Sequence, residues 1–154
     1  YKSMRNAIDY RNGANLFFND QAEGELVYGK GRAYGAEFLL RRQTGKLTGW
    51  VSYTWSRSLR TFDDINFGAE FPAKQDRIHD VAIVAMYTVN DRVKLSANWI
   101  YYTGSAVTFP AGKYEIEGLS VPLYSERNGY RMPNYHRLDV GVTVEPKKKN
   151  PRFE

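Results

Sequence analysis

The chain has 154 residues and a net charge of +5, a length typical of one domain or of part of one. Apolar residues make up 42% and charged residues 25% of the chain, which excludes wholesale disorder. The absence of Cys excludes disulfides and thiolate metal sites, and the basic residues are too scattered to indicate a nucleic-acid partner.

Apolar and polar residues alternate with a period of two along much of the chain, which indicates β-strands and not helices. A weak pattern at residues 2–9 predicts the end of one strand. The clear patterns predict five further strands, at residues 33–41, 47–56, 80–89, 93–102 and 137–145. One face of each of these strands is uncharged, whereas the opposite face mixes polar with apolar residues.

The connections between the expected strands alternate between short and long. Residues 43–46 and 90–91 predict tight turns, whereas residues 57–77 and 104–136 are long loops. Outer-membrane barrels have this asymmetry, with short turns on one side of the membrane and long loops on the other. We therefore expect an all-β fold, an antiparallel up-and-down meander that is a partial slice of about six strands from a larger transmembrane β-barrel.

Aromatic residues cluster near the ends of the uncharged faces. Rings with a polar tip suit the boundary between lipid and water, so these residues predict an aromatic girdle. The alternative is that Tyr and Trp are simply good strand formers. The expected membrane-interface aromatics are Tyr34, Tyr53, Trp55, Tyr87, Trp99 and Tyr101.

Two features indicate that residues 1–154 are only part of a barrel domain. About six strands are fewer than the eight of the smallest common outer-membrane barrels. The tail after residue 145 contains two Pro and three Lys residues and does not alternate, so it reads as another turn.

Four segments together resemble a known family. They are GKGRAYGAE at residues 29–37, TGKLTGWVSYTWS at 44–56, FPAKQDRIHD at 71–80 and RMPNYHRLD at 131–139. In order and spacing, the chain resembles the C-terminal barrel region of TonB-dependent outer-membrane receptors. It is most similar to the Bacteroidetes type, which carries an additional carboxypeptidase-regulatory-like domain.

This resemblance implies a barrel of about 22 strands in the outer membrane, plugged by an N-terminal domain that this sequence lacks. It implies active uptake of a scarce ligand, such as an iron chelate, cobalamin, an oligosaccharide or a peptide. The expected partners are the TonB complex, through the missing plug, the lipids of the outer membrane and the transported ligand. Whether a surface lipoprotein caps the barrel stays open. The alternatives are a non-transporting barrel or adhesin, and a soluble β-rich binding module.

Ionisable residues are densest where the two long loops return to strands. We expect ion pairs at the barrel rim there, because no Ser or Cys nucleophile accompanies them in a recognisable arrangement. The chain is therefore expected to be no enzyme and to hold no metal and no cofactor. The expected rim network consists of Asp76, Arg77, His79, Asp80, His136, Arg137 and Asp139.

The second long loop is rich in Tyr and Arg, which are favoured at binding surfaces. Its candidate ligand-binding residues are Tyr114, Tyr124, Arg127, Tyr130 and Arg131. The alternative for these residues is packing of the loop on itself. In the first long loop, three Phe residues at 62, 67 and 71 could pack together or contact a ligand.

Overall fold

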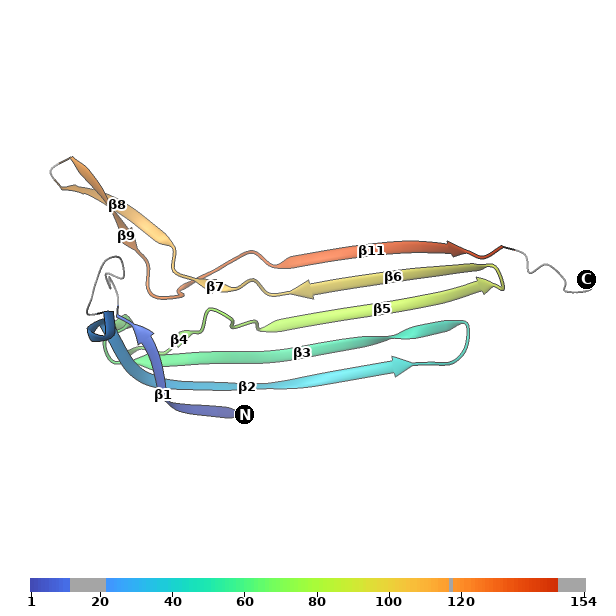
Figure 1. The fold of residues 1–154 in the computed structure, drawn as a ribbon, viewed down its shortest axis with the longest axis horizontal. Helices are drawn as coiled ribbons and strands as arrows, with labels where there is room; N and C mark the ends of the chain where they lie inside the picture. Colours follow the sequence, from blue (N-terminus) through green and yellow to red (C-terminus); the bar gives the residue numbers. More distant parts are fainter. Residues whose placement is uncertain (12–21, 117, 147–154) are drawn as a thin grey trace, which may run out of the picture.

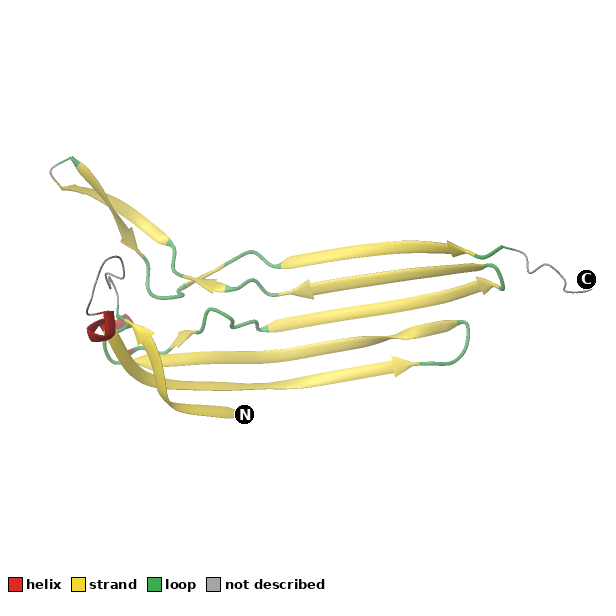
Figure 2. Cartoon of the chain, viewed as in Figure 1, coloured by secondary structure: helices red, strands yellow, loops and turns green. Residues whose placement is uncertain are grey.

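The computed structural model describes residues 1–11, 22–116 and 118–146, which form an all-β structure around one antiparallel sheet (Figures 1 and 2). The spatial order is β1-β2-β3-β5-β6-β11, and a seventh strand, β4, pairs with β3. Apart from short loop strands, spatial neighbours follow one another along the chain. In the described residues β1 and β11 form the two edges, and the sheet does not close. The expected antiparallel meander of about six strands is confirmed.

Six strands form the body of the sheet, and the smaller elements all lie at one end of it. The body consists of β1 (Lys2–Tyr10), β2 (Leu26–Arg42), β3 (Leu47–Phe62), β5 (His79–Asn90), β6 (Val93–Tyr102) and β11 (Tyr135–Val144). The smaller elements are the 3-10 helices η1 (Ala22–Glu25) and η2 (Asn66–Gly68), and the strands β4 (Phe71–Pro72), β7 (Ala106–Val107), β8 (Pro110–Ile116), β9 (Leu119–Tyr124) and β10 (Tyr130–Arg131). β7 pairs with β10, and β8 pairs with β9 to form a hairpin.

Two short turns, at residues 43–46 and 91–92, close the end of the sheet that we call the turn end. Gly45 has a φ of +94°, a conformation that favours glycine. In the second turn, Oδ1 of Asn90 accepts hydrogen bonds of 2.9 Å from the backbone N–H groups of Arg92 and Val93. The opposite end, with the smaller elements and the loops at 63–78 and 103–134, is the loop end (Figure 1).

The two turns are staggered along the strand direction. Pairing between β2 and β3 ends where Arg42 faces Gly49, and Gly49 in turn faces Ala85 of β5. From Ala85, β5 continues for five more residues to Asn90 before it turns. Strands that tilt against a common axis and turn at one level produce such a stagger.

The buried core is small and lies at the loop end. Val27 of β2, Phe62 of β3, Ile65 and Phe71 form one cluster, with 6.1 Å between the ring centroids of Phe62 and Phe71. Burial of a large apolar side chain contributes about 1.5–3 kcal/mol. No described residue of β6 or β11 is buried, so these two strands contribute nothing to the core.

All five clearly predicted strands are present, and the ends of β5, β6 and β11 differ from the prediction by at most two residues. The weak pattern at 2–9 corresponds to β1. β2 and β3 extend further toward the loop end than predicted, because Gly29 and Gly31 continue the pairing with Phe62 and Arg60. The long second loop was predicted without strands, yet it contains β7 to β10. Of the tail that was predicted to form another turn, residues 147–154 lie outside the described residues.

Gly49 allows the close approach of β3 to β5. Its φ is +148°, and a Cβ at this position would lie 2.0 Å from the carbonyl oxygen of Val84. We expect Gly49→Ala to lower the free energy of unfolding by about 1–3 kcal/mol, because backbone atoms must move apart. Equilibrium unfolding in urea, followed by tryptophan fluorescence, measures this change. Gly112→Ala is the matched control, since no atom lies within 4 Å of the added Cβ; equal effects of the two changes would contradict this role.

Candidate functional site

The strand register joins the uncharged faces of five strands into one surface, which we call the apolar face. In one row across the sheet, Leu40 faces Val51, Val51 faces Ile83, Ile83 faces Trp99 and Trp99 faces Leu138. Parallel rows contain Phe38, Tyr53, Val81 and Tyr101, then Ala85, Ala97 and Val140, then Leu47, Tyr87, Leu95 and Val142. Leu40 is 74% and Val140 is 71% exposed, so no second layer of described residues covers this face.

The predicted interface aromatics lie toward the ends of the apolar face. Five of them lie toward the loop end, whereas Tyr87 lies nearer the turn end. The hydroxyl of Tyr53 shares a 2.9 Å hydrogen bond with Nδ1 of His79, and the hydroxyl of Tyr101 accepts one of 2.8 Å from Asn134. The ring centroids lie 5.9 Å apart in Tyr34–Trp55 and 6.2 Å apart in Trp99–Tyr101. Their contact with a membrane interface stays a prediction.

The opposite surface, which we call the polar face, is mixed. Lys94 donates to Glu145 at 2.6 Å, and Arg137 donates to Asp139 at 2.9 Å. Trp50 and Met86 lie among these polar groups, and both are exposed. One face of the sheet is thus free of charge over most of its length, while the other carries ion pairs.

Asp76 is the centre of a buried clamp at the loop end, and it is only 1% exposed. Its Oδ2 accepts a hydrogen bond of 2.5 Å from Arg131, and its Oδ1 accepts one of 2.6 Å from the backbone N–H of Ser58. Arg131 also donates to the carbonyl oxygens of Asp76 and Gly104, at 2.7 and 2.9 Å. Arg57 lies 3.5 Å from Oδ1. The clamp therefore joins β3 to the returning segments of both long loops.

The structure does not bring the other predicted rim residues into one network. Arg77 lies over the ring of Tyr102 at 4.1 Å and 3.7 Å from Asp80. His79 faces Trp55 on the apolar face, where it contacts Tyr53, as described above. His136 faces Tyr101 on that same face, while Arg137 and Asp139 pair with each other on the polar face.

Two of the predicted ligand-binding arginines hold the base of the β8–β9 hairpin. Arg127 donates to the carbonyl oxygen of Tyr10 at 2.5 Å and lies 3.8 Å from Asp9, and Arg131 belongs to the clamp. Tyr130 packs on Phe109, with 5.0 Å between their ring centroids. Tyr114 and Tyr124 lie on the projecting hairpin and are exposed to solvent (Figure 1). Of this set, the three tyrosines are exposed and accessible to a ligand, whereas the two arginines are partly buried in contacts within the chain.

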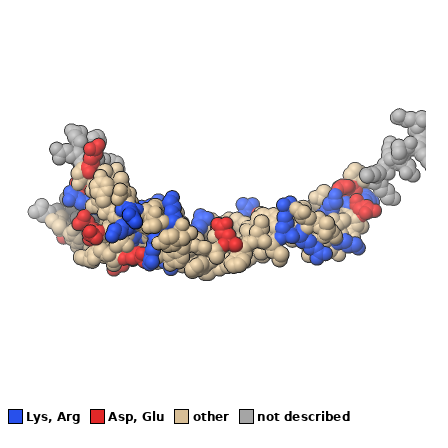
Figure 3. Space-filling model, turned by 90° about the horizontal axis from the view of Figure 1, so that it is seen from below, with Lys and Arg blue, Asp and Glu red and all other residues tan. Residues whose placement is uncertain are grey.

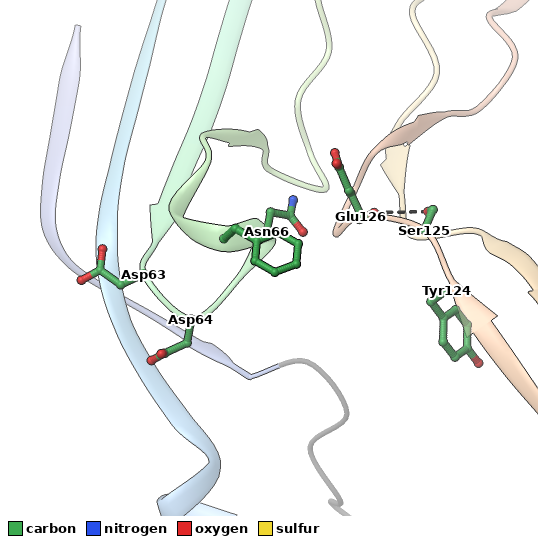
Figure 4. A pocket seen from close by; sticks show the side chains of 7 residues that line it. Asp63, Asp64, Asn66, Tyr124, Ser125 and Glu126 are labelled. Carbon is green, nitrogen blue, oxygen red and sulfur yellow. Dashed lines mark hydrogen bonds between the residues drawn. The ribbon is translucent and has the colours of Figure 1, made fainter.

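An open cleft of about 420 Å³ separates the first long loop from the base of the hairpin (Figure 4). Phe67 is fully exposed beside it, whereas Phe62 and Phe71 are buried together, so the three Phe residues divide between core and surface. The cleft is lined by Asp63, Asp64, Asn66, Phe67, Tyr124, Ser125 and Glu126. Of these lining residues, the sequence had indicated only Phe67 and Tyr124 as possible ligand contacts. The adjacent acidic residues Asp63 and Asp64 were the sequence signal that could have indicated the acidic side of this cleft.

An ion pair between the exposed Arg11 and the partly buried Glu25 joins η1 to the end of β1. The guanidinium of Arg11 donates two hydrogen bonds to the carboxylate of Glu25, and the Arg11 backbone N–H donates to the Glu25 carbonyl at 3.0 Å. The side-chain hydrogen bonds lower the pKa of Glu25 and raise that of Arg11. The stabilisation is therefore present above the ordinary pKa of Glu25 and is lost as the pH falls through the lowered value.

Within the described part of the chain, no three His, Asp or Glu residues lie close enough together to hold a metal ion. No helix among the described residues is long and apolar enough to cross a membrane. No family model, curated protein or solved structure matches the chain. The two faces of the sheet and the loop end are therefore the features that indicate a function.

Proposed function

We propose that the chain forms part of the wall of a transmembrane β-barrel in the outer membrane, and that this barrel is a TonB-dependent receptor. The observation that carries the proposal is the apolar face, which is continuous across five strands and is bounded by short turns at one end. The barrel wall needs apolar residues only on its lipid side, so alternate residues are sufficient.

Strand length and tilt support the same proposal. β5, β6 and β11 have 12, 10 and 10 residues, and a tilted strand needs about 9–11 residues to cross a bilayer. The stagger of the two turns agrees with strands that tilt in a barrel. In this arrangement the polar face, with Lys94–Glu145 and Arg137–Asp139, lines the interior.

The receptor part of the proposal rests on the loop end and on the resemblance of the four sequence segments. The hairpin and the cleft beside Phe67 lie where an external ligand would first meet the barrel. The transported ligand would be an iron chelate, cobalamin, an oligosaccharide or a peptide. The TonB complex would supply energy through a plug domain, and the outer-membrane lipids would surround the apolar face.

Cysteine labelling tests the lipid contact, since the chain has no Cys of its own. We expect a polarity-sensitive dye at Val140→Cys or Val142→Cys to be quenched by a quencher attached to the lipid tails of vesicles. The same dye at Thr143→Cys, on the polar face, is the matched control and should not be quenched. Equal quenching at 142 and 143 would exclude a wall with one lipid side.

The receptor role needs a test in cells. An antibody to this chain should detect, in the outer-membrane fraction, a band several times larger than 17.8 kDa. Disruption of that gene should reduce growth when one scarce nutrient limits the cells. An outer-membrane band without any uptake defect would favour a non-transporting barrel, and a soluble 17.8 kDa band would reject both membrane assignments.

A further inference from the structure

Basic side chains gather at the turn end of the sheet, whereas basic and acidic side chains intermingle at the loop end (Figure 3). The turn end lies at the right of that view, beside the grey trace. Its basic residues are Arg41, Arg42, Lys46, Arg92 and Lys94, and its acidic residues are Asp91 and Glu145. Among the described residues, five positive and two negative charges leave this end with a net charge of +3.

Four of these basic residues, Arg41, Arg42, Lys46 and Arg92, form no ion pair with a described carboxylate. Arg42 donates from Nε to the carbonyl of Thr44 at 3.2 Å, and Arg92 donates to the carbonyl of Glu145 at 3.3 Å. Neutral carbonyl partners orient these guanidinium groups but leave their charge uncompensated. Lys46 has an exposed side chain in the first turn. By contrast, Lys94 pairs with the Glu145 carboxylate at 2.6 Å.

Three of these cations, Arg42, Lys46 and Arg92, lie where the apolar face ends, whereas Arg41 is on the polar face opposite Trp50. Arg42 is the last residue of β2, two residues beyond Leu40 of the apolar face, and Lys46 directly precedes Leu47 of that face. Arg92 lies in the second turn, beside Val93, which faces Val144. Long basic side chains at such a border can lay their stems on apolar surface and keep their charged ends in the water layer.

We infer that the turn end is a docking surface for anionic phospholipid headgroups, bound by Arg42, Lys46 and Arg92. The inference rests on the proposed function, because it places the headgroups at the border of a lipid-covered apolar face. Charge complementarity selects the occupant: each cation at an anionic membrane surface strengthens binding about fivefold, and only within a Debye length of about 8 Å. The loop end, where acidic and basic residues mix, offers no such excess.

Vesicle binding of the full chain tests this inference. Chain unfolded in urea is diluted onto vesicles of neutral phosphatidylcholine, or of phosphatidylcholine with phosphatidylglycerol, and the bound fraction is measured by sedimentation at low and high salt. We expect Arg42→Gln, Lys46→Gln and Arg92→Gln together to weaken binding to the anionic vesicles on the order of 100-fold at low salt. Binding to neutral vesicles should stay unchanged.

The matched control removes the same charge at the other end of the sheet. Lys30, Lys74 and Lys113 are exposed residues of the loop end and form no ion pair with a described carboxylate. Their simultaneous replacement by Gln should change anionic vesicle binding less than fivefold. An equal loss in both triple variants would show that only the net charge matters and would overturn the inference.

The remaining outcomes separate the two proposals. Strong binding to neutral vesicles with no gain from phosphatidylglycerol would overturn the inference and leave the lipid-facing wall intact. Failure to bind either vesicle would overturn both. If the turn-end variant lost binding to single-stranded DNA while keeping its affinity for anionic vesicles, the cations would belong to a nucleic-acid surface and the inference would be wrong.

Discussion

Asp76→Asn should lower the free energy of unfolding by about 3 kcal/mol, near the lower end of the range for breaking a buried ion pair. The Asp76 side chain is fully buried, so the change leaves two cationic side chains beside a neutral amide. Arg131 and Arg57 keep 26% and 30% of their side-chain surface exposed, and the water at these groups limits the loss. Equilibrium unfolding in urea, with the chain in vesicles or detergent, measures the effect.

The loss of stability in Asp76→Asn should appear first at the loop end, because the clamp joins β3 to residues 103–134. Arg131 also holds the carbonyl of Gly104, so its release should free the base of the hairpin. We expect limited proteolysis to cut within residues 103–134 of Asp76→Asn at protease concentrations that leave the unchanged chain intact. The strands at the turn end should keep their protection.

Asp63→Asn is the matched control, because it removes the same charge from an exposed carboxylate in the cleft. Its effect should stay within about 0.5 kcal/mol. A double-mutant cycle with Arg131→Gln should give a coupling energy of about 1–3 kcal/mol with Asp76→Asn. Additive effects of the two changes would show that the pair is not the source of the stabilisation.

The body of the sheet was predictable because its period and its turns are local signals. Alternation in residues 93–102 gave both ends of β6, and Gly45 marked the first turn. The sequence patterns also separated the uncharged face from the mixed face in each of the five clearly predicted strands. The structure added the register, which aligns Leu40, Ile83 and Leu138 in one row although they are far apart in the chain.

The loop end was less predictable because its contacts join distant parts of the chain. Asp76 and Arg131 were assigned separately, to a rim network and to a ligand site, although 55 residues apart they form one clamp. Nothing local in the sequence specifies that partnership. Arg127 likewise had the composition of a binding residue, but its guanidinium reaches back 117 residues to Tyr10. Composition identified the polar residues, and topology decided their partners.

The largest effect expected on the body of the sheet comes from a charge on the apolar face. We expect Ala97→Arg to lower the free energy of unfolding in vesicles by about 2–4 kcal/mol, the cost of Arg near the bilayer midplane on the lipid side of a barrel. Ala97 suits this test because it faces Ala85 and Val140, in a row between the two ends of the apolar face. Urea titration of the vesicle-bound chain measures the change.

Asn98→Arg is the matched control, because the next residue of β6 points to the polar face. There the new guanidinium lies opposite Asp139 and Val84, where it stays near water and next to a carboxylate. Asn98→Arg should lower the free energy of unfolding by less than about 1 kcal/mol. The two variants carry the same new side chain and the same added charge on adjacent residues of one strand. A difference of 2 kcal/mol or more exceeds the span of about 1 kcal/mol in strand propensity and would come from what each face contacts, whereas equal costs would mean that lipid does not cover the apolar face.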